Sequence, residues 1–274
     1  MRKILAMALI IFLCMAGYDM LTDKPQPTQP TQKQEEMQSK HEKKAAMAIF
    51  TTLLPARETW PASMQKFYLA FNMDEAIDPI RQSKDWTPLD SMSQDIPHAL
   101  IAIEDHDFYN HGAIAVDGIL RALLVNITAG EVVQGGSTLT QQFVKNVFLS
   151  HEQSMERKVE EAILSLMLED NYSKDEILEL YLNTTYFGAG ANGIHQASKT
   201  YFGKAPSALT LAESAVIASL PYAPSSLNPL ENPEGCKKRQ LLVLNAMLKY
   251  GLINQGQLAE AKAERIQLTN GTVM

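Results

Sequence analysis

The stretch TLTQQFVKNVF, residues 138–148, decides the fold class of this chain. Thr138 and Gln141 have the spacing of a capping box, in which the first side chain bonds the helix start and the fourth bonds back. The apolar residues after them recur at helical intervals: Phe143, Val144, Val147 and Phe148. We expect Gln141 and Lys145 to lie one turn apart on the opposite face. The stretch therefore predicts an amphipathic α-helix.

Similar helix signals extend along the chain on the C-terminal side of this stretch. Further capping boxes begin at Ser173 and Thr210, and the apolar run behind Thr210 predicts a buried helix that Pro221 ends. Asn232 followed by proline opens another helix, and Gly251 is placed to close it. No stretch alternates apolar and polar residues between hairpin turns, so the sequence predicts an all-α fold.

The composition is that of an ordinary globular protein, large enough for one core and a small extra lobe. The 274 residues are 46% hydrophobic and 20% charged. The formal net charge is -7 and no block of Lys or Arg occurs, which disfavours a nucleic-acid partner. Cys14 and Cys236 form neither a disulfide framework nor a metal-binding pattern.

The N-terminus carries the pattern of a membrane-targeting segment. Arg2 and Lys3 precede an apolar run over residues 4–17, whose length lies between a signal-peptide core and a full membrane span. Cleavage after Ala16 is one alternative, and an uncleaved anchor over residues 1–21 is the interpretation that we favour. In both cases the paired cations place the N-terminus in the cytoplasm and the rest of the chain outside.

Residues 22–44 change abruptly in composition, to Pro, Gln, Thr, Lys and Glu. Such a segment cannot bury enough apolar area to offset its ordering entropy, so it predicts a disordered tether. Folded sequence resumes near Ala45. We expect residues 45–85 to form a membrane-proximal segment, whose apolar positions pack in the core or face the membrane.

Carboxylates and imidazoles gather directly after an apolar lead-in at residues 99–103. The string EDHDFYNHG covers residues 104–112, and Glu104 opens it. A carboxylate at the end of an apolar helix is partly desolvated, which raises its pKa and suits it to act as a base. An acidic helix end followed by a loop would give the same pattern, so the string alone leaves both interpretations open.

A second polar string, GGSTLTQQFVKN, covers residues 135–146. Paired glycines ahead of a capped helix leave backbone N–H groups free at its positive end, and such an end is a site for an anion. A flexible loop before a well-capped surface helix is the plainer alternative for the same string.

A third string, RKVEE at residues 157–161, opens another predicted helix. We expect its core stripe to consist of Val159, Ala162, Ile163, Leu166 and Met167. Arg157 and Glu161 are four residues apart and therefore point to one side. A surface ion pair of about 0.3–0.5 kcal/mol is one interpretation. The order with the basic residue first is the poorer one for stability, which favours a functional role.

Together these strings resemble the glycosyltransferase domain of bifunctional penicillin-binding proteins and of monofunctional peptidoglycan glycosyltransferases. The matching boxes are EDxxFxxHG from Glu104, GGSTxTQQ from Gly135, RKxxE from Arg157 and ILExYLN from Ile177. They stand in the family's order along the chain. With its flanks, the similarity covers roughly two-thirds of the sequence, and four boxes in order are far more specific than one.

The resemblance implies a lysozyme-like helical domain with two lobes, the smaller resting in the membrane surface. It also implies a reaction in which the GlcNAc 4-hydroxyl of lipid II attacks the anomeric carbon of the lipid-linked MurNAc on the growing glycan. Undecaprenyl pyrophosphate leaves, and the new β-1,4 bond has inverted configuration. The implied partners are lipid II, the growing glycan and the membrane, with other cell-wall synthesis proteins as further candidates. The implied location is the extracytoplasmic side of a bacterial inner membrane, on a single-pass anchor.

The resemblance also implies site roles, box by box. Glu104 is the general base, and Glu161 resembles the family's second carboxylate, which is proposed to organise the pyrophosphate, a cation or the donor. The residues expected to shape the acceptor end are Asp105, Phe108 and His111. Those expected to bind the donor are Ser137, Thr138, Gln141, Gln142, Lys145 and Asn146. Arg157 and Lys158 would neutralise the leaving pyrophosphate, where charge grows in the transition state.

Three details qualify this assignment. The resemblance leaves open a divalent cation such as Mg²⁺ or Mn²⁺ near Glu161, and it implies no other cofactor. Many relatives carry Lys or Arg where Gln153 stands, so one phosphate-facing cation is absent from this sequence. We expect Tyr181, Asn183 and Gly188 to build the wall of the groove, with structural roles.

The expected organisation is an anchor (1–21), a tether (22–44), a membrane-proximal segment (45–85), a glycosyltransferase domain (86–265) and a tail (266–274). A transpeptidase domain needs Ser-x-x-Lys, Ser-x-Asn and Lys-Thr-Gly. The sequence contains no Lys-Thr-Gly, and its Ser-x-x-Lys string at Ser63 lies ahead of the glycosyltransferase boxes. We therefore expect a monofunctional enzyme.

Two other functions compete with this interpretation. A lysozyme-like hydrolase or lytic transglycosylase would cut glycan with one acidic glutamate. It would have no need of Lys145, Arg157 and Lys158 aimed at a pyrophosphate. An inactive anchored scaffold is the other alternative, and the presence of both Glu104 and Glu161 argues against it.

Overall fold

The computed structural model describes residue 68 and residues 72–115, 136–149 and 154–274. The predicted anchor (1–21) and tether (22–44) lie outside the described residues, as do Gly135 and Gln153, so these predictions stay predictions. Among the residues that the structure describes, no helix combines the length and the apolar character needed to cross a bilayer.

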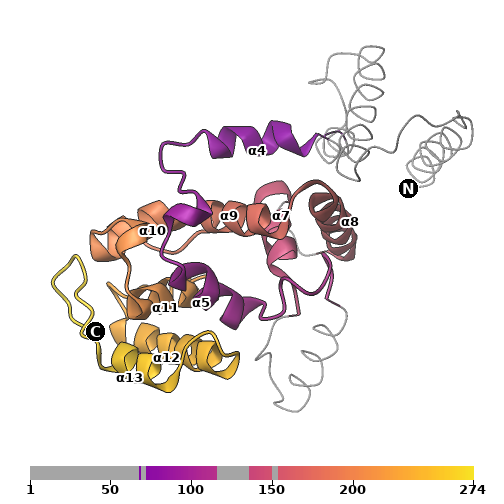
Figure 1. Ribbon diagram of the computed structural model, residues 1–274. Coiled ribbons are helices and arrows are strands. Elements are labelled where there is room, and N and C mark those ends of the chain that lie inside the picture. Colours follow the sequence, from indigo (N-terminus) through magenta and orange to yellow (C-terminus); the bar gives the residue numbers. More distant parts are fainter. Residues whose placement is uncertain (1–67, 69–71, 116–135, 150–153) are drawn as a thin grey trace, which may run out of the picture. The chain divides into compact units, whose positions relative to one another are not determined.

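Helices make up the regular structure (Figure 1). In chain order they are α4 (Met73–Arg81), η2 (Leu89–Ser91), α5 (Asp95–Glu104), α7 (Leu139–Phe148), α8 (Met155–Asn171), α9 (Lys174–Thr184), α10 (Gly193–Phe202), η3 (Pro206–Ala208), α11 (Leu211–Ser219), α12 (Pro233–Lys249) and α13 (Gln255–Ala263). The described residues form no strand, and their only β-type pairings are two isolated bridges. The all-α prediction is confirmed, while a lysozyme-like division into two lobes stays a prediction.

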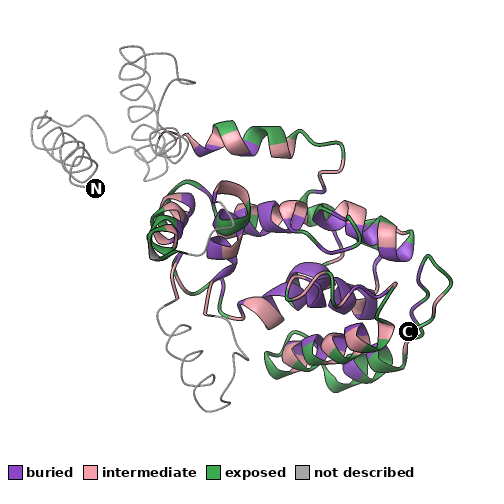
Figure 2. Cartoon of the chain, turned by 180° about the vertical axis from the view of Figure 1, so that it is seen from behind, coloured by how far each residue is buried: buried purple, intermediate pink, exposed green. Residues whose placement is uncertain are grey.

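The described helices pack in two groups. Helix α5 packs against α11 and α12, which also pack against each other. Helix α7 packs against α8 and α9, and α9 packs against α10. Within the first group, residues Ala212–Ser219 of α11 are all buried (Figure 2). Glu104, the last residue of α5, reaches a side chain of α7, so it stands where the two groups meet.

Capping side chains fix the helix starts as the sequence predicts. The three predicted capping boxes are all formed, at Thr138, Ser173 and Thr210, and each cap contributes about 1 kcal/mol. Asn232 caps α12 ahead of its proline, and Gly251 follows the end of that helix with a φ of 74°. Glycine suits this position because a left-handed backbone strains residues that carry a Cβ atom.

The predicted core face of α8 is wrong. The expected stripe lies largely in solvent, with Val159 57%, Ile163 53% and Leu166 55% exposed, and with Ala162 and Met167 half-buried. Glu161 and Leu168 are buried in its place. A buried carboxylate requires polar partners, and Glu161 finds one on α7, Gln141, so this contact fixes which face of α8 turns inward. We call Val159, Ile163 and Leu166 the α8 stripe.

Candidate active site

Glu104 ends α5, directly behind buried residues of the apolar lead-in. Burial is the main reason why the pKa of its carboxyl group is raised, and the negative charge of Asp105 adds to the effect. The hydrogen bond from Gln142 and the positive charges of Arg239 and Lys145 act in the opposite direction. A raised pKa makes the carboxylate a stronger base, and this is the environment that the sequence predicted.

A chain of hydrogen bonds orients the Glu104 carboxylate. Gln142 Nε2 donates to Glu104 Oε2 over 3.0 Å, and the Tyr181 hydroxyl donates to Gln142 Oε1 over 3.1 Å. Tyr181 is buried, and burial together with the charge of Glu104 keeps the pKa of its hydroxyl well above the usual range. The hydroxyl therefore stays protonated and sets which end of the amide faces Glu104. No described residue donates to Glu104 Oε1, so that oxygen is available to a substrate.

Asp105 and His111 join the loop after α5 to the start of α7. Asp105 Oδ1 lies 2.6 Å from His111 Nε2, and Asp105 Oδ2 accepts a 3.0 Å hydrogen bond from the backbone N–H of Leu139. Phe108 is fully buried, and Lys174 Nζ lies 4.5 Å from the centroid of its ring. These three predicted acceptor-end residues therefore hold the shape of the loop beside Glu104.

Glu161 is the centre of a second polar cluster. Its side chain is 2% exposed and accepts a 3.2 Å hydrogen bond from Gln141 Nε2. Lys158 Nζ contacts the same carboxylate oxygen and donates to Ser137 Oγ over 3.1 Å. Arg157 Nη1 lies 3.9 Å from the other carboxylate oxygen. The carboxylate thus gathers two cations at the start of α8.

Gln141 does not lie on the outer face of α7, as the sequence predicted, but is buried. Its backbone N–H and side-chain oxygen form the capping box with Thr138, whose hydroxyl also donates to the carbonyl oxygen of Ala113 over 2.8 Å. Lys145 and Asn146, farther along the same helix, are exposed. Gln141 and Gln142, rather than Lys145 and Asn146, are therefore the residues of α7 that bond the two glutamates.

Arg157 retains unused hydrogen-bond donors. Its Nε atom is enclosed, and no described residue accepts a hydrogen bond from it. Its backbone N–H is satisfied by the Ser154 hydroxyl, which caps α8 over 3.1 Å. An enclosed N–H without an acceptor is unfavourable, so the position favours a ligand that brings acceptor oxygens. A phosphate group has that chemistry.

Two adjacent residues of α7 connect the two clusters. Gln141 bonds Glu161 and Gln142 bonds Glu104, so the glutamates that the sequence separates by 57 positions meet neighbouring side chains of one helix turn. One glutamate is desolvated and faces an amide, whereas the other faces an amide and two cations. The arrangement allows a base and an anion-binding group to contact the same substrate.

The cluster at Glu161 does not fit a divalent cation. The amine of Lys158 already occupies one carboxylate oxygen, and the guanidinium of Arg157 approaches the other. Within the described part of the chain no group of three or more His, Cys, Asp or Glu side chains is placed to hold a metal ion. Oxygen ligands in such number are what Mg²⁺ or Mn²⁺ requires, so we assign no step to a metal.

Sequence reasoning missed two groups near Glu104. Arg239 and Tyr222 come from α12 and from the turn after α11, and their side chains stack with 4.0 Å between the Arg239 Cζ atom and the Tyr222 ring centroid. It also gave Tyr181 a purely structural role, although Tyr181 bonds the glutamine that orients Glu104. No local pattern could have found Arg239, because it lies far from the boxes along the chain.

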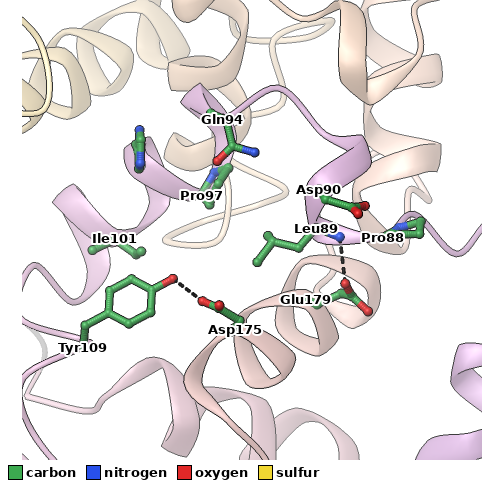
Figure 3. Close-up of a pocket in the computed structure, with 10 residues that line it drawn as sticks. Pro88, Leu89, Asp90, Gln94, Pro97, Ile101, Tyr109, Asp175 and Glu179 are labelled. Carbon is green, nitrogen blue, oxygen red and sulfur yellow. Dashed lines mark hydrogen bonds between the residues drawn. The ribbon is translucent and has the colours of Figure 1, made fainter.

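A cavity of about 460 Å³ lies between η2, α5 and α9 (Figure 3). Asp175 accepts a 2.8 Å hydrogen bond from the Tyr109 hydroxyl on one side of it, and Glu179 accepts a 2.7 Å bond from the backbone N–H of Leu89 on another. None of the predicted catalytic or binding residues lines this cavity. This cavity would therefore not have located the two glutamates.

Comparisons with known proteins support the family that the four sequence boxes indicate. A sequence model described as "Transglycosylase" matches residues 70–248. A protein of Cupriavidus necator named "Putative transglycosylase" is 41% identical over 194 residues, which are 71% of this chain and 84% of that protein. "Penicillin-binding protein 1A" of Neisseria flavescens is 45% identical over 185 residues, 68% of this chain and 23% of that protein.

A solved structure is also similar in sequence. The crystal structure of Penicillin-Binding Protein 1A from Haemophilus influenzae matches with 34% identity and a TM-score of 0.34, over 48% of this chain and 16% of that one. The chain spans about a quarter of the length of Penicillin-binding protein 1A from Neisseria flavescens and from Aquifex aeolicus. The match nevertheless covers most of this sequence and includes all four boxes. The chain belongs to the transglycosylase family and contains a peptidoglycan glycosyltransferase domain.

Proposed function

We propose that this domain polymerises lipid II into β-1,4-linked glycan and releases undecaprenyl pyrophosphate. The observation that carries the proposal is the pair of adjacent glutamines on α7. One holds a desolvated glutamate with a free oxygen, and the other holds a glutamate that gathers two cations. A transfer from a pyrophosphate donor needs both of these groups, because one proton must leave the acceptor while negative charge builds on the leaving group.

Glu104 acts as the base in the proposed reaction. Its free Oε1 takes the proton of the acceptor 4-hydroxyl while the hydroxyl oxygen forms the new bond to the anomeric carbon of the donor. The bond from that carbon to the pyrophosphate oxygen breaks, and its electron pair leaves with the pyrophosphate. Attack from the side opposite the leaving group inverts the configuration. Gln142 keeps the carboxylate aimed during this step.

Arg157 and Lys158 receive the departing pyrophosphate. The enclosed Nε of Arg157 has no acceptor among the described residues, and the Lys158 side chain is 45% exposed, so both cations have donors left for phosphate oxygens. Glu161 holds the two cations in place, which stabilises the leaving group without reorganisation at the moment of reaction. Lys145 contributes a further positive charge near Glu104.

We further propose that the α8 stripe faces the membrane in which the lipid-linked substrate resides. Three large aliphatic side chains on one face of a helix are unusual in solvent, and this helix also carries Arg157 and Lys158 in its first turn. With the predicted anchor at 1–21 and the tether at 22–44, the domain at 86–265 would work on the extracytoplasmic surface.

Incubation of the full chain with labelled lipid II in detergent micelles, followed by gel separation, tests the main proposal. We expect a ladder of glycan polymers that muramidase digests to disaccharide units, and no ladder with Glu104→Gln. Release of soluble muropeptides from purified cell wall without any polymer from lipid II would instead favour a lytic enzyme. A lack of both activities in the intact chain would favour a scaffold and overturn the proposal.

A further inference from the structure

Arg239 presents a guanidinium group with unused donors. No hydrogen bond or ion pair joins it to a described residue, and its Nε atom is enclosed without an acceptor. One face of the group instead lies against the Tyr222 ring, 4.0 Å from its centroid. Stacking of this kind fixes the plane of a guanidinium while its N–H edges stay free. The arrangement is costly for a merely structural arginine, because packing encloses a donor without satisfying it.

The position of Arg239 relates it to Glu104. It lies on α12, which packs against α5, the helix that Glu104 ends. Among nearby charges, that of Arg239 lowers the pKa of Glu104 most, and that of Lys145 on α7 comes next. Glu104 therefore lies within the field of two cations that come from different helices.

The absence of a direct ion pair makes this arrangement suitable for a base. Lys158 contacts its carboxylate Glu161 directly and so occupies an oxygen that could otherwise take a proton. None of the described ion pairs includes Glu104, although the charge of Arg239 reaches it. A cation that makes no contact favours the ionised carboxylate and leaves Oε1, the oxygen that Gln142 does not bond, free for a proton.

We propose that Arg239, fixed by its stack on Tyr222, is a positioning residue that keeps the Glu104 carboxylate ionised without occupying it. The stack on Tyr222 restrains where the guanidinium lies, whereas an unstacked side chain would be free to rotate. Tyr222 is thereby a second positioning residue, although its ring is 59% exposed. This inference rests on the proposed role of Glu104 as the base.

The test is the pH dependence of kcat/KM with labelled lipid II, measured on the full chain. Arg239→Gln should move the acidic limb of the profile to higher pH, so that the loss is at least about three-fold greater near pH 6 than near pH 8. Arg239→Lys should recover much of the profile, because it restores the charge. Tyr222→Phe keeps the stack and should leave the limb in place, whereas Tyr222→Ala should shift it part of the way towards Arg239→Gln.

Lys238→Gln is the matched control, because it removes an exposed positive charge from the adjacent position of the same helix. It should leave the profile unchanged. A loss in Arg239→Gln that is equal at every pH would mean a structural role alone and would overturn the inference. Thermal unfolding of each variant separates that outcome from loss of the fold.

A second readout does not depend on turnover. Titration of the Glu104 carboxyl carbon by NMR, in the wild type and in Arg239→Gln, measures the pKa directly. A higher value in the variant supports the inference even if lipid II is not polymerised, and an unchanged value refutes it. The proposed function fails on a different result, namely the absence of polymer from the wild type.

Discussion

Glu104 and Glu161 each accept a hydrogen bond from a glutamine of α7, yet their other neighbours differ. Glu104 lies at the end of an apolar helix, and no described cation touches it. Glu161 is equally close to α7, but Lys158 and Arg157 both reach its oxygens. Two residues of one type, one on α5 and one on α8, are thus prepared for different tasks. Desolvation without contact raises proton affinity, whereas direct ion pairing turns a carboxylate into a support for cations.

The largest effect should come from neutralising the base. Glu104→Gln should lower kcat/KM for lipid II by at least about a thousand-fold, because the amide cannot take the acceptor proton. The measurement is the initial rate of polymer formation. Asp107→Asn, an exposed carboxylate in the same box, is the matched control and should keep nearly full activity. Near-normal turnover in Glu104→Gln would contradict the proposal that Glu104, and not Glu161, is the base.

Removal of a cation from the other cluster should have the next largest effect. Arg157→Ala should reduce kcat by about a hundred-fold, because the loss falls on charge that develops only as the pyrophosphate leaves. The same rate measurement at saturating lipid II checks it. Arg265→Ala, an exposed arginine near the C-terminus, serves as the control. A rise in KM with unchanged kcat would assign Arg157 to ground-state binding and weaken the proposed leaving-group role.

Stability should respond in opposite directions at the two sites. The pKa of Glu104 is raised from 4.5 in the folded protein, so folding favours its protonated form, and this contribution is lost as pH rises through the folded value. Glu104→Gln should therefore raise Tm at pH 7, and the gain should fade as the pH falls through the folded value and be gone below about 4.5. Glu161→Gln should instead cost about 2 kcal/mol, because it leaves Arg157 and Lys158 without their buried counter-ion.

Calorimetry across this pH range measures both effects on one scale. A loss of about 2 kcal/mol corresponds to a fall in Tm of roughly 4–8 °C for a domain of this size. If both substitutions raised Tm at pH 7, or both lowered it, the comparison would be contradicted. The two carboxylates would then share one kind of environment.

The parts of the site that follow from the sequence are those with local causes. The capping boxes at Thr138, Ser173 and Thr210 depend on residues three apart, and all three are formed. The environment of Glu104 follows from the apolar residues immediately before it. Arg239 could not be found in this way, because it reaches the site only through the packing of α12 on α5.

The face of α8 shows how a pattern misleads. Apolar periodicity predicted that Val159, Ile163 and Leu166 face the core, but the buried Glu161 bonds Gln141 of α7 on the other side of the helix. A single buried carboxylate with three polar contacts outweighed the apolar stripe, since leaving it unpaired costs several kcal/mol. Helical periodicity gives the angle between residues, and tertiary contacts decide which face is inside.

A smaller effect should follow from loosening the amide of Gln142. Tyr181→Phe removes the hydroxyl that donates to Gln142 Oε1 and should lower kcat/KM by about five-fold, the value of one neutral hydrogen bond. The measurement is the rate of polymer formation. Tyr186→Phe, on an exposed tyrosine just after the end of α9, is the control. No change in Tyr181→Phe would show that Gln142 holds Glu104 without help.

The smallest effect on stability should come from a substitution in the α8 stripe. Its size, set against that of a substitution on the buried face, tests which face of α8 is inside. Ile163→Ser should change the free energy of unfolding by no more than about 0.5 kcal/mol in detergent-free buffer, because the side chain is already exposed. Leu168→Ala on the inner face of the same helix should cost about 2–5 kcal/mol. Binding to lipid vesicles should show the reverse order, with Ile163→Ser weakening it and Leu168→Ala leaving it nearly unchanged if the fold persists. A large loss of stability in Ile163→Ser would mean that the stripe packs inside the protein, and the membrane would no longer be needed to explain it.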